Sequence, residues 1–84
     1  MTDQAIQPHQ QRVIDEKTEL DQKATALSQF IGSSSVFLTL DSDEQSRLRE
    51  QCELMWSYSE VLGARISAFM QNLKNAAAPK DGGK

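Results

Sequence analysis

The sequence predicts an all-α protein: a two-helix antiparallel hairpin with a short apolar plug between the helices, copies of which assemble into a homo-oligomer. Apolar residues recur at helical spacing in two long segments, a stretch with one glycine and three serines separates them, and the second segment carries two apolar stripes. At 84 residues the chain forms one small domain. We expect residues 1–74 to make up that domain and residues 75–84 to form a flexible tail.

The first helix is expected over residues 8–31. Pro8 suits the first turn of a helix, where a backbone N–H has no partner to lose. Gly32 is expected to end the helix, and the three serines at 33–35 to form a loop. The apolar positions that repeat at helical spacing are Val13, Leu20, Ala24, Leu27 and Ile31.

The second helix is expected over residues 42–73. Asp41 with Glu44, or Ser42 with Gln45, provides a capping box at its start. Before it lies a short apolar patch without a partner strand, which we expect to plug the open end of the hairpin; it contains Val36, Phe37, Leu38 and Leu40.

The second helix carries two apolar stripes. The first seam, which is expected to pack inside the hairpin, consists of Leu48, Cys52, Met55, Ser59, Leu62, Ile66, Phe69 and Leu73. The second seam consists of Leu54, Tyr58, Val61, Arg65 and Ala68. Because one seam is enough for a hairpin, the second predicts self-association, and a cation such as Arg65 within it calls for an anion.

Composition excludes several classes of function. A formal net charge of −3 and a pI near 5.0 argue against a protein that coats long nucleic acid. Motifs for catalysis, for a cofactor and for a metal site are absent, so we expect no enzyme and a role for Cys52 in packing. A polar N-terminus, the lack of a long apolar run and a single cysteine fit a soluble protein of a reducing cytoplasm.

One side of the first helix is polar. The residues that recur there at spacings of three and four are His9, Arg12, Glu16, Glu19 and Lys23. One interpretation is a solvated face with surface ion pairs, Arg12 with Glu16 or Glu19 with Lys23. The other is that His9, Lys23 and Thr25 meet the same groups of a second subunit around an anionic ligand. Trp56 and Tyr58 are interpreted as packing residues.

The sequence also resembles a known family. The stretch 8–21 (PHQQRVIDEKTELD), followed by Lys23, Leu27 to Gly32 and the positions Gln51, Met55, Tyr58, Leu62, Arg65, Ile66 and Phe69, resembles small phage proteins related to a crAss-like phage family. The resemblance covers about positions 8 to 70. That family includes the anti-CBASS sponge, which binds cyclic-nucleotide messengers of bacterial immunity.

The resemblance implies a hexamer that holds cyclic dinucleotides between paired subunits and cyclic trinucleotides in separate pockets. It implies that Lys23 contacts phosphate and Thr25 donates a hydrogen bond in the dinucleotide pocket, and that Arg65 serves the trinucleotide pocket. Sponge members place a stacking aromatic residue near the start of the first helix, where this chain has Pro8 and His9.

The function hypothesis is therefore a phage anti-CBASS sponge, which sequesters cyclic oligonucleotides without cleaving them in the cytoplasm of the infected host. The candidate ligand-binding residues are Pro8, His9, Lys23 and Thr25 for cyclic dinucleotides and Arg65 for cyclic trinucleotides. The alternative is a small helical oligomer that binds another protein through its second seam and takes no small ligand.

Overall fold

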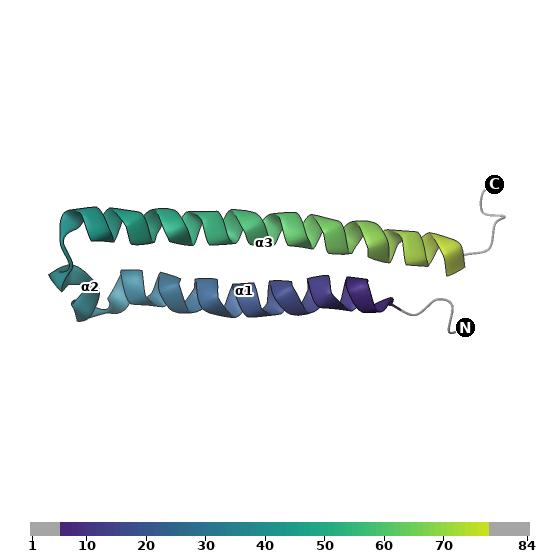
Figure 1. Cartoon of the computed structure of the whole chain (residues 1–84), viewed down its shortest axis with the longest axis horizontal. Coiled ribbons are helices and arrows are strands. Elements are labelled where there is room, and N and C mark those ends of the chain that lie inside the picture. Colours follow the sequence, from purple (N-terminus) through teal and green to yellow (C-terminus); the bar gives the residue numbers. More distant parts are fainter. Residues whose placement is uncertain (1–5, 78–84) are drawn as a thin grey trace.

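The computed structural model describes residues 6–77, which form a hairpin of two long helices. Helices α1 (Pro8–Ser33) and α3 (Ser42–Ala77) run antiparallel, and the short helix α2 (Ser35–Thr39) lies at the turn between them (Figure 1). The molecule measures 61 × 24 × 17 Å. The prediction of an all-α chain is confirmed for these residues.

Helix α1 begins where the sequence predicts and ends two residues later. Pro8 is its first residue, and the side chain of Gln10 accepts a hydrogen bond of 2.9 Å from the backbone N–H of Gln7. Gly32 was predicted to end the helix, but it lies within the helix and has no positive φ. The break instead falls at Ser34, whose backbone is extended and whose N–H still donates to the Phe30 carbonyl.

The serines at 33–35 were predicted to form a loop, but the chain enters a new helix directly after Ser34. The Ser34 hydroxyl accepts a hydrogen bond from the N–H of Val36 and so caps α2. This helix forms the predicted plug, with Phe37 1% exposed at its centre, but it lies at the turn and not at the open end, where α1 begins and α3 ends (Figure 1). The rings of Phe37 and Phe30 meet edge to face with their centroids 5.8 Å apart, and the guanidinium carbon of Arg49 lies over the Phe37 ring, 5.1 Å from its centroid.

Helix α3 is capped by Asp41, one of the two predicted caps. Its carboxylate accepts a hydrogen bond of 2.7 Å from the Glu44 N–H. The side chain of Glu44 does not complete a capping box but pairs with Arg47, while the amide of Gln45 donates to the carbonyls of Phe37 and Leu40. The helix extends to Ala77, beyond the predicted end at 73, and the rest of the predicted tail lies outside the described residues.

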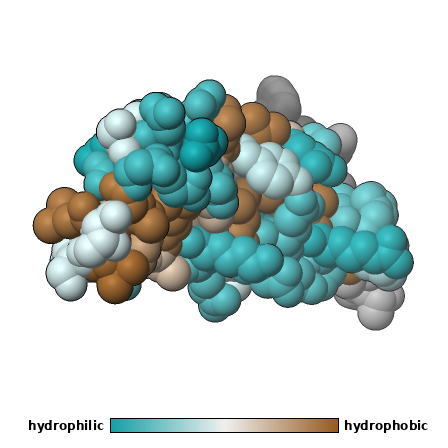
Figure 2. Space-filling model, turned by 60° about the vertical axis from the view of Figure 1, so that its left-hand side comes forward, coloured by the Kyte–Doolittle hydropathy of each residue, from teal (hydrophilic) through white to brown (hydrophobic). Residues whose placement is uncertain are grey.

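The core is narrow and follows the first seam of α3. Leu62 is 0% exposed, and Val13, Ala24 and Cys52 are also buried at other levels along the two helices. The first seam therefore faces α1 as predicted, whereas Leu54, Tyr58 and Val61 of the second seam are exposed. Hydrophobic residues also gather on the surface at the α2 end (Figure 2), where Val36 and Leu38 are exposed.

Candidate functional site

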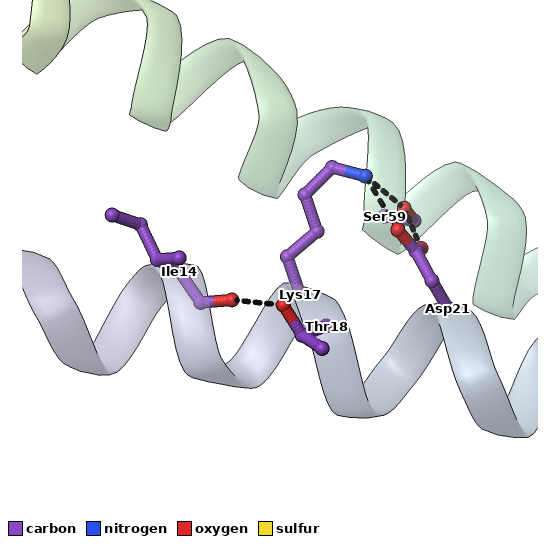
Figure 3. A network of polar contacts seen from close by, with 5 residues as sticks. All are labelled: Ile14, Lys17, Thr18, Asp21 and Ser59. Atoms are coloured by element: carbon purple, nitrogen blue, oxygen red, sulfur yellow. Dashed lines mark hydrogen bonds and ion pairs between the residues drawn. The ribbon is translucent and has the colours of Figure 1, made fainter.

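A polar network fixes α1 against α3 midway along the hairpin. Lys17 donates from Nζ to the Asp21 carboxylate at 2.7 Å and to the Ser59 hydroxyl at 3.1 Å, and that hydroxyl donates to Asp21 (Figure 3). Ser59 is 4% exposed, so the network lies at the edge of the core. The pKa of Asp21 is lowered from its ordinary value, chiefly by the hydrogen bond from Lys17 and next by the hydrogen bond from Ser59. Burial opposes this shift because it raises the pKa.

A second contact joins the polar side of α1 to the second seam of α3. The hydroxyl of Tyr58 donates a hydrogen bond to the carboxylate of Glu16. The polar residues of α1 and the second seam of α3 therefore lie on the same side of the hairpin. This arrangement places His9, Lys23 and Arg65 along one surface.

The register of the hairpin determines which of these residues are neighbours. His9 precedes Glu16 by seven residues and Arg65 follows Tyr58 by seven, which is two helical turns or about 10 Å along each axis. Because the helices are antiparallel, both steps lead to the open end of the hairpin and keep to the same side. His9 and Arg65 thus lie at one level, across from each other.

The residues predicted to bind a cyclic dinucleotide do not converge within one chain. His9 and Lys23 are 14 positions apart on α1, about 21 Å along its axis. Lys23 shares a side of the helix with Glu16, but Thr25, two positions on and about 200° around, lies on the other. A ligand that contacts Lys23 and Thr25 together therefore needs groups from more than one subunit.

Thr25 belongs instead to an open hollow on α1. This hollow has a volume of about 500 Å³ and is lined by Thr18, Asp21, Gln22, Thr25, Ala26 and Gln29. Its lining is mostly apolar in area but includes hydroxyl, amide and carboxylate groups, and one of them is the carboxylate that Lys17 and Ser59 hold in place. It offers hydrogen-bonding groups and a negative charge, but no cation.

The remaining predicted site residues are exposed at the open end. Pro8 and His9 occupy the first turn of α1, and Arg65 lies on the exposed seam of α3. Among the side chains that the structure describes, in residues 6–73, the ion pairs are Lys17–Asp21 and Arg47–Glu44, so neither surface pair considered for Arg12 and Lys23 is formed. The described part of α3 holds no carboxylate three or four positions from Arg65.

Sequence reasoning missed two features of this surface. Tyr58 was interpreted only as a packing residue, but its hydroxyl forms a hydrogen bond with Glu16. The signal for this polar role in the sequence is the phenol group itself among the apolar residues of the second seam. Arg12 was treated only as a partner for Glu16, yet Glu16 is engaged by Tyr58. Spacing along one helix could not reveal either point, because both depend on the register between helices.

The described residues show no grouping of His, Cys, Asp and Glu side chains suited to a metal ion. Over the same part of the chain, no helix combines the length and apolar character of a membrane span. A family model described as Sequestin matches residues 7–68, which is most of the chain. No curated protein and no solved structure matches it.

Proposed function

The chain belongs to the Sequestin family, a name that indicates a sequestering role, and on that premise we propose that it is a phage sponge for cyclic oligonucleotide messengers. It binds them at the boundaries between its own subunits and does not cleave them. By keeping cyclic di- or trinucleotides from bacterial immune effectors, it acts in the host cytoplasm through mass action alone. No catalytic group is required.

The observation that carries this proposal is the exposed surface that joins basic and apolar residues. His9 and Arg65 lie at one level at its open end, and the exposed apolar residues Val61 and Leu54 precede Arg65 on α3 by about 6 and 16.5 Å along the axis. A cation within an apolar contact needs an anion, and the planar guanidinium fits a phosphate. A cyclic oligonucleotide supplies phosphates together with flat apolar bases.

The proposal requires self-association, and the exposed apolar residues of the second seam favour it. Leu54 is 62% exposed and Val61 is 56% exposed in the single hairpin. If two copies of α1 cross antiparallel near Glu16, His9 of each copy faces Lys23 of the other, which brings together residues that one chain keeps about 21 Å apart.

Thermal unfolding in the presence of ligand tests the proposal. A ligand present at about 100 times its dissociation constant, bound only by the folded assembly, adds about 2.7 kcal/mol of stability. A panel of cyclic di- and trinucleotides should therefore raise the melting temperature, and the nucleotide recovered after denaturation should be intact. No shift with any member at millimolar concentration would exclude a sponge, and recovery of cleaved nucleotide would indicate an enzyme.

A different candidate follows from the exposed second seam, since apolar residues of this kind also bind other proteins. In that case Arg65→Ala improves or leaves unchanged the binding of a protein partner, and no cyclic nucleotide binds at all. For a sponge, the same variant still assembles but loses nucleotide binding. Sedimentation and calorimetry on the one variant separate the two functions.

A further inference from the structure

We propose that Arg12 and Arg65 form one phosphate clamp at the open end of the hairpin, with His9 at its edge. The inference rests on the proposed function for the identity of the ligand, a phosphodiester of a cyclic oligonucleotide. It adds a residue, Arg12, for which the sequence offered only a surface ion pair. It also assigns His9 and Arg65 to one site instead of two.

The register places the two arginines together. Arg12 precedes Glu16 by one turn, about 6 Å along α1, and Val61 and Arg65 follow Tyr58 by about 4.5 and 10.5 Å along α3. Along the hairpin axis, Arg12 therefore lies between Val61 and Arg65. It lies on the same side of the hairpin as the hydrogen bond between Tyr58 and Glu16. The two guanidinium groups therefore belong to facing edges of the same surface.

The carboxylates next to Arg12 are engaged elsewhere. Asp15, three positions on, accepts a hydrogen bond of 2.9 Å from the side chain of Gln11, and Glu16, four positions on, accepts one from Tyr58. Neither forms an ion pair with Arg12 among the described residues. Tyr58 therefore draws the nearest long carboxylate toward α3, which leaves the Arg12 guanidinium available.

Like charges on facing helices repel each other unless an anion lies between them. Two guanidinium groups present several N–H donors in planar forks, a geometry that matches the oxygens of one phosphate. The exposed Val61, one turn before Arg65 on α3, lies close to the level of Arg12 and provides an apolar contact for a sugar or base. A phosphodiester that carries a nucleoside satisfies both features, whereas a simple carboxylate satisfies only the charge.

Calorimetry on arginine variants tests the clamp. Arg12→Gln and Arg65→Gln should each weaken binding of a cyclic trinucleotide or dinucleotide by about tenfold or more, the usual value of a hydrogen bond to a charged group. The double variant should lose less than the product of the two, because both groups hold the same phosphate. Arg12→Lys should behave like Arg12→Gln, since the ammonium keeps the charge but not the fork.

Arg47→Gln is the matched control, because Arg47 is an exposed arginine of α3 near the closed end and pairs with Glu44. It should leave the affinity unchanged. Sedimentation of each variant checks that assembly is intact. Affinity unaltered by Arg12→Gln, with a loss for Arg65→Gln, would overturn the clamp and leave the sponge in place.

Pyrophosphate separates the clamp from the proposed function. Its addition to ¹⁵N-labelled protein should shift the Nε–Hε resonances of Arg12 and Arg65 together and leave that of Arg47 in place. If these shifts occur but no cyclic oligonucleotide binds, the clamp stands and the sponge fails. If neither pyrophosphate nor any nucleotide moves the Arg12 resonance, the clamp itself is wrong.

Discussion

The ammonium group of Lys17 lies 3.1 Å from the hydroxyl oxygen of Ser59, a residue 42 positions later in the chain. The same ammonium group lies 2.7 Å from the Asp21 carboxylate, which also accepts the Ser59 hydroxyl (Figure 3). Apolar seams alone permit two helices to slide by a turn, whereas a directional hydrogen bond between helices favours one register. The surface that carries His9, Arg12 and Arg65 depends on this register.

Removal of the central hydroxyl should weaken the hairpin. Ser59→Ala leaves Lys17 and Asp21 paired within α1 but takes away their link to α3, so the free energy of unfolding should fall by about 1 kcal/mol. Urea unfolding measures the change. Ser57→Ala is the control, because Ser57 is exposed on the same helix and gains the same helix propensity. Equal stability of the two variants would contradict a structural role for the network.

Acid should release the same network. Because the pKa of Asp21 is lowered in the folded state, its contribution to stability is present above the pKa of the unfolded chain and is lost as pH falls through the folded value. Asp21→Asn should therefore be less stable than the wild type at pH 7, and the difference should shrink as pH falls below about 4. Unfolding curves from pH 7 to pH 2 provide the test. A constant difference over that range would show that Asp21 does not titrate in this way.

Gly63 is a glycine inside α3 that lies against the stem of Lys17. A Cβ placed at Gly63 would lie 3.3 Å from Cε of Lys17, while the adjacent Nζ is tied to Asp21 and Ser59. Alanine gains about 1 kcal/mol over glycine in a helix interior, but here it must displace that stem. Gly63→Ala should therefore stabilise the Lys17→Ala variant more than it stabilises the wild type. A double-mutant cycle measures the difference, and simple additivity would show that Lys17 moves aside freely.

The two seams of α3 should respond differently to the same substitution. Leu62 is 0% exposed, so Leu62→Ala should cost about 2–5 kcal/mol of stability. Leu54 is 62% exposed, so Leu54→Ala should change the stability of the single hairpin by less than about 0.5 kcal/mol. If the second seam forms a subunit contact, the wild-type melting temperature rises with protein concentration and Leu54→Ala reduces that dependence. Melting at two concentrations decides this, and no dependence in the wild type would contradict assembly.

Periodicity predicted the two long helices because apolar spacing is local information. The exposure of Leu54 and Val61 followed from it, since a stripe beside the packed one has no partner within a hairpin. The predicted end of α1 was wrong because glycine at position 32 permits a helix to end but does not require it. The hydroxyl of Ser34, two residues later, caps a new helix instead. Local composition does not rank these two choices.

The candidate site was harder to predict than the fold. The sequence identified His9 and Arg65 as ligand candidates, but the register between α1 and α3, which brings them to one level, depends on side-chain contacts between helices. The opposite placement of Lys23 and Thr25 follows from helix geometry alone and did not need the structure. A ligand that contacts both Lys23 and Thr25 needs groups from more than one subunit, and the sequence of one chain does not specify how subunits pack.

Tyr58 should control the availability of Arg12 through Glu16. Tyr58→Phe removes the hydroxyl that holds the Glu16 carboxylate on the α3 side, and Glu16 can then pair with Arg12 four positions earlier. Such a pair is worth a few tenths of a kcal/mol, so the affinity for a cyclic oligonucleotide should fall by about twofold at low salt.

Addition of Glu16→Gln to Tyr58→Phe should restore the affinity, because the amide carries no charge to compete with phosphate. Calorimetry at 20 and 200 mM salt, conditions of roughly 20 and 7 Å screening length, compares the three proteins. A loss that Glu16→Gln does not rescue would mean that Tyr58 contacts the ligand directly and does not act through Glu16.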